Sequence, residues 1–334
     1  MRRALPAFCV LVLAGCFSLA EKKNPYLIAP PEKPTTIRTL HHTFALQMLS
    51  ERRAASVSLQ AFNTGTLRTR GEAVSALKSY NAKVKLDVPA FLIKHSKQGW
   101  ILFGTGLSPQ RERRPGEALV RVVKFLASFD YTFRYEQKKG RDIVAQLREE
   151  GISPAEIRWI IVPYWDAATV GMLDSFPGAT VVVNRREWEW QQEAAAAKPG
   201  PLAPAVFAGK IKLQFVDMHN QPAFGAFENG VDFFGDGSLY LVSLSGRTPG
   251  SIGAWLNLDN GPVLLTGGAA FVVDNYMDFA LPVKDKIFDL EYYWHSLHVI
   301  HAMRRGVPQV VVFPGNDLVP LRLSARSDIS RGGK

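Results

Sequence analysis

Residues 151–173, GISPAEIRWIIVPYWDAATVGML, contain a helix end, a helix start and a buried strand in close succession. Gly151 is typical of the residue that follows a helix. Ser153 followed by Pro154 is typical of a helix N-terminus, because the serine side chain caps free N–H groups and proline lacks one. The apolar run at 159–162 then predicts a fully buried strand.

Short apolar segments and helical patterns continue this alternation on both sides. Strands are expected at 57–63, 90–94, 100–103, 180–183, 211–215, 239–242, 252–256, 263–265 and 310–313, and helices at 116–129, 141–150 and about 290–305. Tight turns are expected at 63–65 and 104–106, and the alanine- and proline-rich residues 194–204 are expected to form a surface loop or lid. Many strands with few helices predict an α/β domain of two packed sheets flanked by helices.

The composition is that of a globular protein with a large core. Hydrophobic residues make up 47% of the 334 residues and charged residues 21%, which excludes disorder over most of the chain. The formal net charge is +10, but the basic residues do not gather with interleaved aromatic residues. We therefore expect no nucleic-acid partner.

The N-terminal residues resemble a bacterial lipoprotein signal. Arg2 and Arg3 precede an apolar run at 4–13, and the residues LAGC at 13–16 stand where a cleavage site belongs. The run is too short to cross about 30 Å of hydrocarbon. The resemblance implies cleavage before Cys16 and acylation of its thiol, so that Cys16 attaches the protein to a membrane.

This interpretation divides the chain into residues 1–15 as the signal peptide, 16–37 as a lipid-anchored, proline-rich linker and 38–334 as the folded domain. Cys9 is removed with the signal and Cys16 carries lipid, so the mature domain has no free thiol for catalysis. The resemblance implies a location in the bacterial cell envelope. Phe17 after the cysteine favours the outer membrane over the inner one.

An ordered series of landmarks resembles the metallo-β-lactamase superfamily, and most of all its N-acyl homoserine lactonase-like branch. The landmarks are FGTG at 103–106, GISP at 151–154, GML at 171–173, FGDGS at 234–238, RTPGS at 247–251, LTGGA at 265–269 and PGND at 314–317. The resemblance covers roughly residues 57–323. It implies an αββα four-layer sandwich with a dinuclear metal site, commonly zinc, and hydrolysis of lactones or other esters and amides.

The metal ligands that this resemblance implies are replaced. The seven positions fall on Tyr164, Asp166, Ala168, Thr169, Arg247, Gly268 and Asn316. A catalytic zinc needs about three protein ligands and an open water position, and only Asp166 offers a strong ligand. A guanidinium at Arg247 stays protonated and repels a dication. We therefore expect a pseudoenzyme without a cofactor, the alternative being a single divalent metal such as zinc.

Arg247 suggests how the scaffold survives the loss of metal. A carboxylate that stays buried needs a counter-charge. We expect Arg247 to reach Asp166 or Asp317 and to occupy the vacated metal volume, with Tyr164 and Asn316 completing its hydrogen bonds. The alternative is that Arg247 points to solvent from a loop.

Three functions of different classes remain open. The first is a non-catalytic ligand-binding or scaffold protein, whose former active-site cleft takes a small anionic or carbonyl-bearing ligand. Its cleft is lined by Tyr164, Asp166, Thr169, Arg247, Asn316 and Asp317. The second is a hydrolase with a rearranged or single-metal site, or with metal-free acid–base chemistry. The third is a structural envelope protein whose cleft is filled by its own side chains.

Two further groups of residues are expected to be structural. His295, His298 and His301 lie at i, i+3 and i+6 on a predicted helix, so their side chains do not converge on one ion. The aromatic run at 188–190 is expected to pack in the core or at an interface.

Overall fold

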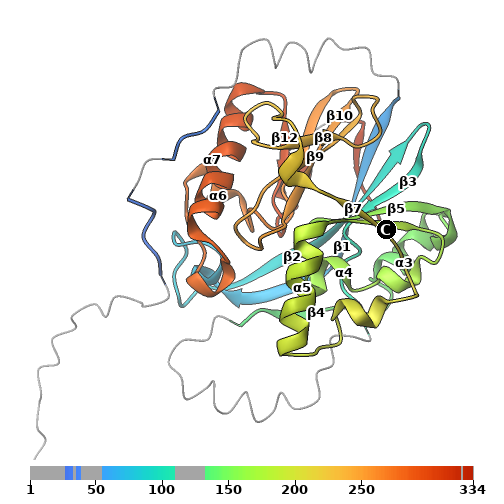
Figure 1. Cartoon of the computed structure of the whole chain (residues 1–334), viewed down its shortest axis with the longest axis horizontal. Coiled ribbons are helices and arrows are strands. Elements are labelled where there is room, and N and C mark those ends of the chain that lie inside the picture. Colours follow the sequence, from blue (N-terminus) through green and yellow to red (C-terminus); the bar gives the residue numbers. More distant parts are fainter. Residues whose placement is uncertain (1–26, 33–34, 39–54, 110–131, 325, 334) are drawn as a thin grey trace, which may run out of the picture.

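The computed structural model describes residues 27–32, 35–38, 55–109, 132–324 and 326–333 (Figure 1). The predicted lipoprotein signal, Cys16 and the helix expected at 116–129 lie outside these residues. Among the described residues, no helix combines the length and the hydropathy that crossing a bilayer requires.

Two β-sheets form the centre of the protein. The larger sheet has eight strands in the order β13-β1-β2-β3-β5-β6-β7, with β4 also paired to β1. Its strands are β1 (Val57–Arg70), β2 (Lys83–His95), β3 (Gly99–Phe103), β4 (Arg134–Glu136), β5 (Ile157–Val162), β6 (Thr180–Asn184), β7 (Lys212–Val216) and β13 (Ile329–Arg331). Strands β3, β5, β6 and β7 run parallel, so helices connect them.

The smaller sheet has five strands in the order β12-β11-β10-β9-β8. These are β8 (Gly230–Asp232), β9 (Leu239–Ser243), β10 (Ile252–Leu258), β11 (Gly261–Leu265) and β12 (Val311–Phe313). Strand β12 runs parallel to β11, whereas the other pairs are antiparallel.

Helices cover the outer face of each sheet, which gives the expected αββα sandwich (Figure 1). The α-helices are α3 (Ile143–Glu149), α4 (Ala167–Val170), α5 (Arg185–Ala197), α6 (Val273–Met277), α7 (Leu290–Gly306) and α8 (Val319–Leu323). The 3-10 helices are η1 (Gly71–Ala73), η2 (Pro154–Glu156), η3 (Leu173–Ser175), η4 (Pro204–Phe207), η5 (Met218–Asn220) and η6 (Lys284–Lys286).

Apolar side chains fill three layers of core. Between the sheets, Ile93 and Ile101 of the larger sheet meet Leu241 and Leu265 of the smaller one. Helix α7 buries its apolar face on the outer side of the smaller sheet through Tyr293, Leu297 and Ile300, which pack near Trp255 and Leu264. Helix α3 and the segments around α4 and η3 pack on the larger sheet in the same way. Each fully buried large side chain contributes about 1.5–3 kcal/mol.

The segment at 151–162 folds as predicted. Gly151 ends the helical region with a φ of +77°. The Ser153 side chain accepts a hydrogen bond from Ala155 N–H, and the Glu156 carboxylate accepts one from Ser153 N–H, which forms a capping box. Strand β5 follows directly.

Two local predictions were wrong. The turn expected at 63–65 is a bulge inside β1, where the Asn63 side-chain oxygen accepts hydrogen bonds from the N–H groups of Gly65 and Val88. The loop expected at 194–204 begins only after Ala197, because the alanine run extends α5.

The loops that follow several strands meet at one edge of the sandwich. The loop after β5 contacts the start of β10, where Ile252 N–H donates to Pro163 O at 2.8 Å. The loop after β12 contacts the loop after β11, where Gly315 N–H donates to Ala270 O at 2.8 Å. These loops carry six of the seven positions at which the resemblance implies metal ligands, and the seventh, Arg247, lies in the loop between β9 and β10.

Candidate functional site

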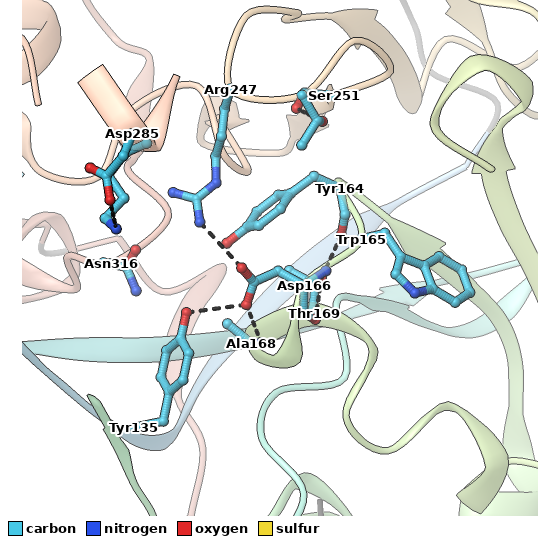
Figure 2. Close-up of polar contacts among 12 residues, drawn as sticks. Tyr135, Tyr164, Trp165, Asp166, Ala168, Thr169, Arg247, Ser251, Asp285 and Asn316 are labelled. Atoms are coloured by element: carbon cyan, nitrogen blue, oxygen red, sulfur yellow. Dashed lines mark hydrogen bonds and ion pairs between the residues drawn. The ribbon is translucent and has the colours of Figure 1, made fainter. Parts of the chain in front are cut away.

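Asp166 is the N-cap of the short helix α4 and lies at the centre of the site (Figure 2). Its Oδ1 accepts hydrogen bonds from the Tyr135 hydroxyl and from Ala168 N–H, both at 3.1 Å. Its Oδ2 lies 3.5 Å from Nη2 of Arg247. Both carboxylate oxygens are therefore engaged by groups of the protein itself.

Arg247 enters this site from the loop between β9 and β10, as Figure 2 shows. Its side chain is 8% exposed. The guanidinium carbon lies 4.5 Å from the ring centre of Tyr164 and 4.3 Å from that of Phe271, which are cation–π distances. Among the described residues, its Nη1 has no hydrogen-bond partner. Of the two partners expected for Arg247, Asp166 or Asp317, the contact with Asp166 is confirmed, and the alternative of a solvent-facing arginine is wrong.

The guanidinium is charged in this environment. Burial acts to lower the pKa of Arg247, but the neighbouring Tyr164 and Asp166 raise it, and the net shift is upward. A permanent cation therefore sits where the resemblance placed metal ions.

Gly268 makes room for this cation. A Cβ at position 268 would come within 2.6 Å of Arg247 Cδ and 2.9 Å of Tyr164 Cδ1. Real Cβ atoms do not approach other atoms so closely, and the neighbouring side chains are themselves buried. A carboxylate side chain at this position, one of the seven at which the resemblance implies metal ligands, is thus incompatible with Arg247 in its observed place.

Asn316 and Asp317 do not join the cluster, which corrects the expectation that Asn316 completes the hydrogen bonds of Arg247. The Asn316 amide donates to the main-chain oxygen of Asp87 at 2.9 Å, and this partner directs it away from the guanidinium. The Asp317 carboxylate accepts from Val319 N–H at 2.8 Å. Tyr164 contacts Arg247 through the face of its ring, not through a hydrogen bond from its hydroxyl.

Thr169 closes the turn that positions Asp166. Its hydroxyl donates to the main-chain oxygen of Tyr164 and accepts from Asp166 N–H. Ala168 contributes its main-chain N–H to Asp166, so its methyl side chain takes no part in binding a ligand. Within 164–169, the polar groups of the predicted cleft residues therefore make hydrogen bonds to one another.

Sequence reasoning missed Glu187, a residue of the first turn of α5 that is 1% exposed. Its carboxylate accepts hydrogen bonds from Trp165 N–H at 2.7 Å and from Gly250 N–H at 3.2 Å. It thereby joins the loop that carries Asp166 to the loop that carries Arg247. Burial raises the pKa of Glu187. The spacing from Asn184 to Glu187 resembles a capping box. The actual partners of Glu187, Trp165 and Gly250, lie far away in the chain, so no local pattern predicts them.

Tyr135 was also missed. It lies on β4 and donates to Asp166 across 31 positions of the chain. The three-residue strand that carries it has no distinctive pattern, so only the folded arrangement reveals this contact.

The described side chains leave little free space in the site. The cavity beside Tyr164, Ala168, Thr169 and Gly267 has a volume of about 20 Å³, which holds about one water molecule. A small carbonyl-bearing ligand would therefore require these residues to move.

The residues present do not fit a dinuclear zinc centre. Burial raises the pKa of Tyr164 to about 12, so its phenol is protonated at neutral pH and is a poor ligand. Asp166 is held by three donors, and Arg247 brings positive charge to the same point. Within the described ranges, no three or more His, Cys, Asp or Glu side chains gather closely enough to hold a metal ion.

The histidines of the described residues lie away from Asp166. On α7, His298 Nδ1 contacts the main-chain oxygen of Trp294, and His301 Nδ1 contacts that of Tyr276. His295 instead lies 3.5 Å from Glu228. These separate partners are consistent with structural roles.

His95 joins the two sheets through buried polar contacts. Its Nε2 lies 3.0 Å from the Ser238 hydroxyl and 3.1 Å from the Asp236 carboxylate, while Nδ1 accepts from Lys97 N–H and Gln98 N–H. Serine and aspartate meet the same ring nitrogen, which is not the arrangement of a catalytic triad. Burial lowers the pKa of His95.

Known proteins resemble this chain both in sequence and in fold. It is 26% identical to the N-acyl homoserine lactonase AttM of Azorhizobium caulinodans over 233 residues, which cover 68% of this chain and 81% of that protein. No protein-family model matches the chain.

Solved structures show the same fold at lower identity. An N-acyl homoserine lactone hydrolase, with the product N-hexanoyl-L-homoserine bound at its catalytic metal centre, has a TM-score of 0.61 and 18% identity, covering 81% of this chain and 98% of that one. The dizinc quorum-quenching lactonase AidC has a TM-score of 0.51 and 14% identity, covering 86% of this chain and 91% of that one. These likenesses identify the architecture.

Proposed function

We propose that this chain, which is similar in sequence and fold to lactonases of the metallo-β-lactamase superfamily, is a metal-independent, non-hydrolytic protein that acts as a scaffold of the cell envelope. The single observation that carries the proposal is the position of Arg247. Its buried guanidinium pairs with Asp166 and fills the volume that Gly268 leaves free. An organic cation thus takes over the stabilising role that a metal would have among these loops.

The small volume beside the pair favours a scaffold over a ligand-binding cleft. About 20 Å³ of free space remains beside Tyr164, and Thr169 is engaged with the main chain. The anionic or carbonyl-bearing ligand expected from the sequence therefore has no open place next to Arg247 among the described residues. The interactions of the scaffold must involve other surfaces.

The envelope location is part of the same proposal. It rests on the residues LAGC at 13–16, in which Cys16 would be acylated after cleavage. Two or more acyl chains would hold the domain on a membrane, and Phe17 favours the outer one. A radiolabelled palmitate incorporation assay on cells that express the chain, with Cys16→Ser as the control, tests this point.

A second candidate is a hydrolase of lactones or other esters and amides, with a rearranged or single-metal site. The observation that favours it is the relationship to proteins named lactonases, one of them described as a dizinc enzyme. In this chain, Asp166 is the one carboxylate at the seven positions. For a single zinc to bind, Asp166 would have to break its contact with Arg247, and other side chains would have to join it as zinc ligands.

Hydrolysis of N-hexanoyl homoserine lactone distinguishes the two candidates. We expect the purified chain to open the lactone no faster than buffer does, with or without added zinc, because the Asp166 carboxylate is held by Tyr135, Ala168 and Arg247 and is not available to bind a metal that activates water. Turnover that is lost in Asp166→Asn and in the presence of a chelator would replace the scaffold proposal with the hydrolase.

A further inference from the structure

A second hollow lies beside α8, the helix that follows Asn316 in the chain. It is a cavity of about 270 Å³ between α8 and β13, with Asp87 of β2 also in its wall. This volume corresponds to about nine water molecules. It is somewhat smaller than the roughly 300–1,000 Å³ of sites for drug-sized molecules. The hollow is therefore suited to a small ligand.

The walls of this hollow combine apolar and cationic side chains. Leu318, Leu321 and Ile329 provide the apolar part. Arg322 and Arg331 provide two guanidinium groups on exposed residues at the ends of α8 and β13. A ligand that satisfies both kinds of wall has a charged end and an aliphatic end.

The acidic side chain of the hollow is already satisfied. Asp87 Oδ1 accepts from the Asn63 amide at 2.5 Å, and Oδ2 accepts from Leu318 N–H at 3.4 Å. Burial raises the pKa of Asp87, and the charge of Asp317 acts in the same direction, while the charges of Arg322 and Arg331 act to lower it. Asp87 is thus a fixed part of the wall.

Arg322 and Arg331, in contrast, have N–H groups that can bind a ligand. In the part of the chain that the structure describes, neither Arg322 nor Arg331 makes an ion pair, whereas Arg326 between them is held by Asp328 at 2.9 Å. Each guanidinium has five N–H donors in a planar arrangement that matches a carboxylate or a phosphate. Unpaired cations beside an apolar hollow favour an anionic ligand.

We propose that this hollow binds a small amphipathic anion, whose carboxylate or phosphate pairs with Arg322 and Arg331 and whose short aliphatic part packs on Leu318, Leu321 and Ile329. The site is separate from the Arg247–Asp166 pair and gives the scaffold a ligand class. The same chemistry occurs in a free fatty acid and in an anionic lipid at the membrane surface. Leu323, which follows Arg322 on α8, is 80% exposed.

Calorimetric titration with hexanoate tests the site in the full-length chain carrying Cys16→Ser, which removes the predicted acylation point. We expect saturable binding of one hexanoate per chain and none of hexylammonium, which has the same aliphatic chain and the opposite charge. Arg322→Gln/Arg331→Gln should weaken hexanoate binding about tenfold or more, because both ion pairs are lost. Arg305→Gln, an exposed arginine on α7, is the matched control and should leave binding unchanged.

Vesicles of phosphatidylglycerol distinguish the source of the anion. Cosedimentation that is lost in the double variant identifies a lipid ligand, and hexanoate binding without cosedimentation identifies a soluble one. The proposal is overturned if hexanoate does not bind, if hexylammonium binds equally well, or if the double variant binds as the unsubstituted chain does. If the double variant unfolds, Arg331→Gln alone should still weaken hexanoate binding at least about threefold. None of these outcomes depends on lactone hydrolysis or metal content, so the two proposals can fail independently.

Discussion

The pairing of Arg247 with Asp166 predicts strong energetic coupling between the two side chains. Asp166→Asn keeps the shape of the residue, its cap on Ala168 and its contact with Tyr135, but removes the charge opposite Arg247. The guanidinium, 8% exposed, is then left without a counter-ion among the described residues. Arg247→Met in turn removes the cation and keeps an aliphatic side chain of comparable length.

The expected magnitudes follow from burial. Removing one partner of a buried ion pair costs about 3–5 kcal/mol. Asp166 is 31% exposed and the pair is separated by 3.5 Å, so we expect about 2–3 kcal/mol for Asp166→Asn. Arg247→Met loses two cation–π contacts, which contribute about 0.5–2 kcal/mol each. The unpaired buried Nη1 destabilises the unsubstituted protein by about 1–3 kcal/mol, and Arg247→Met removes this cost. The net loss in the free energy of unfolding should therefore be about 1 kcal/mol.

The double variant should lose no more than Arg247→Met alone, because no cation remains for Asp166 to neutralise. The coupling energy is therefore about 2 kcal/mol. Thermal unfolding of the four proteins measures it, with a shift of about 2 °C per kcal/mol for a domain of this size. Effects that add within about 0.5 kcal/mol would refute the view that the pair stabilises these loops.

Three further predictions concern the surroundings of the pair. Glu187→Ala should lower the free energy of unfolding by about 2–4 kcal/mol, because Trp165 N–H and Gly250 N–H lose their acceptor, whereas Glu189→Ala on the exposed face of α5 should stay within about 0.5 kcal/mol in urea denaturation. Gly268→Ala should cost about 1–3 kcal/mol through its overlap with Arg247 and Tyr164, and calorimetry should show a smaller loss in an Arg247→Ala background; equal losses in the two backgrounds would contradict the steric argument. The pKa of His95 is lowered in the folded state, so its contribution to stability is complete above the unfolded pKa of about 6.5 and is lost as the pH falls below it. His95→Gln should flatten this fall in the midpoint of thermal unfolding, and an unchanged pH profile would show that other groups cause it.

Much of the fold followed from local patterns in the sequence. The buried strand at 159–162 and the capping residues Ser153 and Pro154 have the structure that their residue types favour. The failures have tertiary causes. Asn63 and Gly65 have turn propensity, but the strand continues because β1 pairs with β2 on both sides of the bulge. Position 65 suits glycine because a side chain there would collide with Leu107 and the main chain at Glu136.

The sequence predicted the central ion pair of the site but not the residues that hold this pair and its loops in place. An arginine at position 247 predicted a contact with Asp166 or Asp317, because a buried charge requires a partner, and the contact is with Asp166. Asn316 is directed elsewhere by Asp87, a residue 229 positions away. Glu187 and Tyr135 likewise act on residues far along the chain. Such partners depend on the packing of the two sheets, which no local pattern contains.

Metal content is the most direct test of the central claim that Arg247 has replaced a metal ion. The purified chain would be incubated with zinc, manganese and iron, dialysed, and examined by inductively coupled plasma mass spectrometry. Because a zinc site needs several converging ligands, the account predicts less than about 0.1 metal ion per chain. A content near one metal ion per chain that is lost in Asp166→Asn would contradict it.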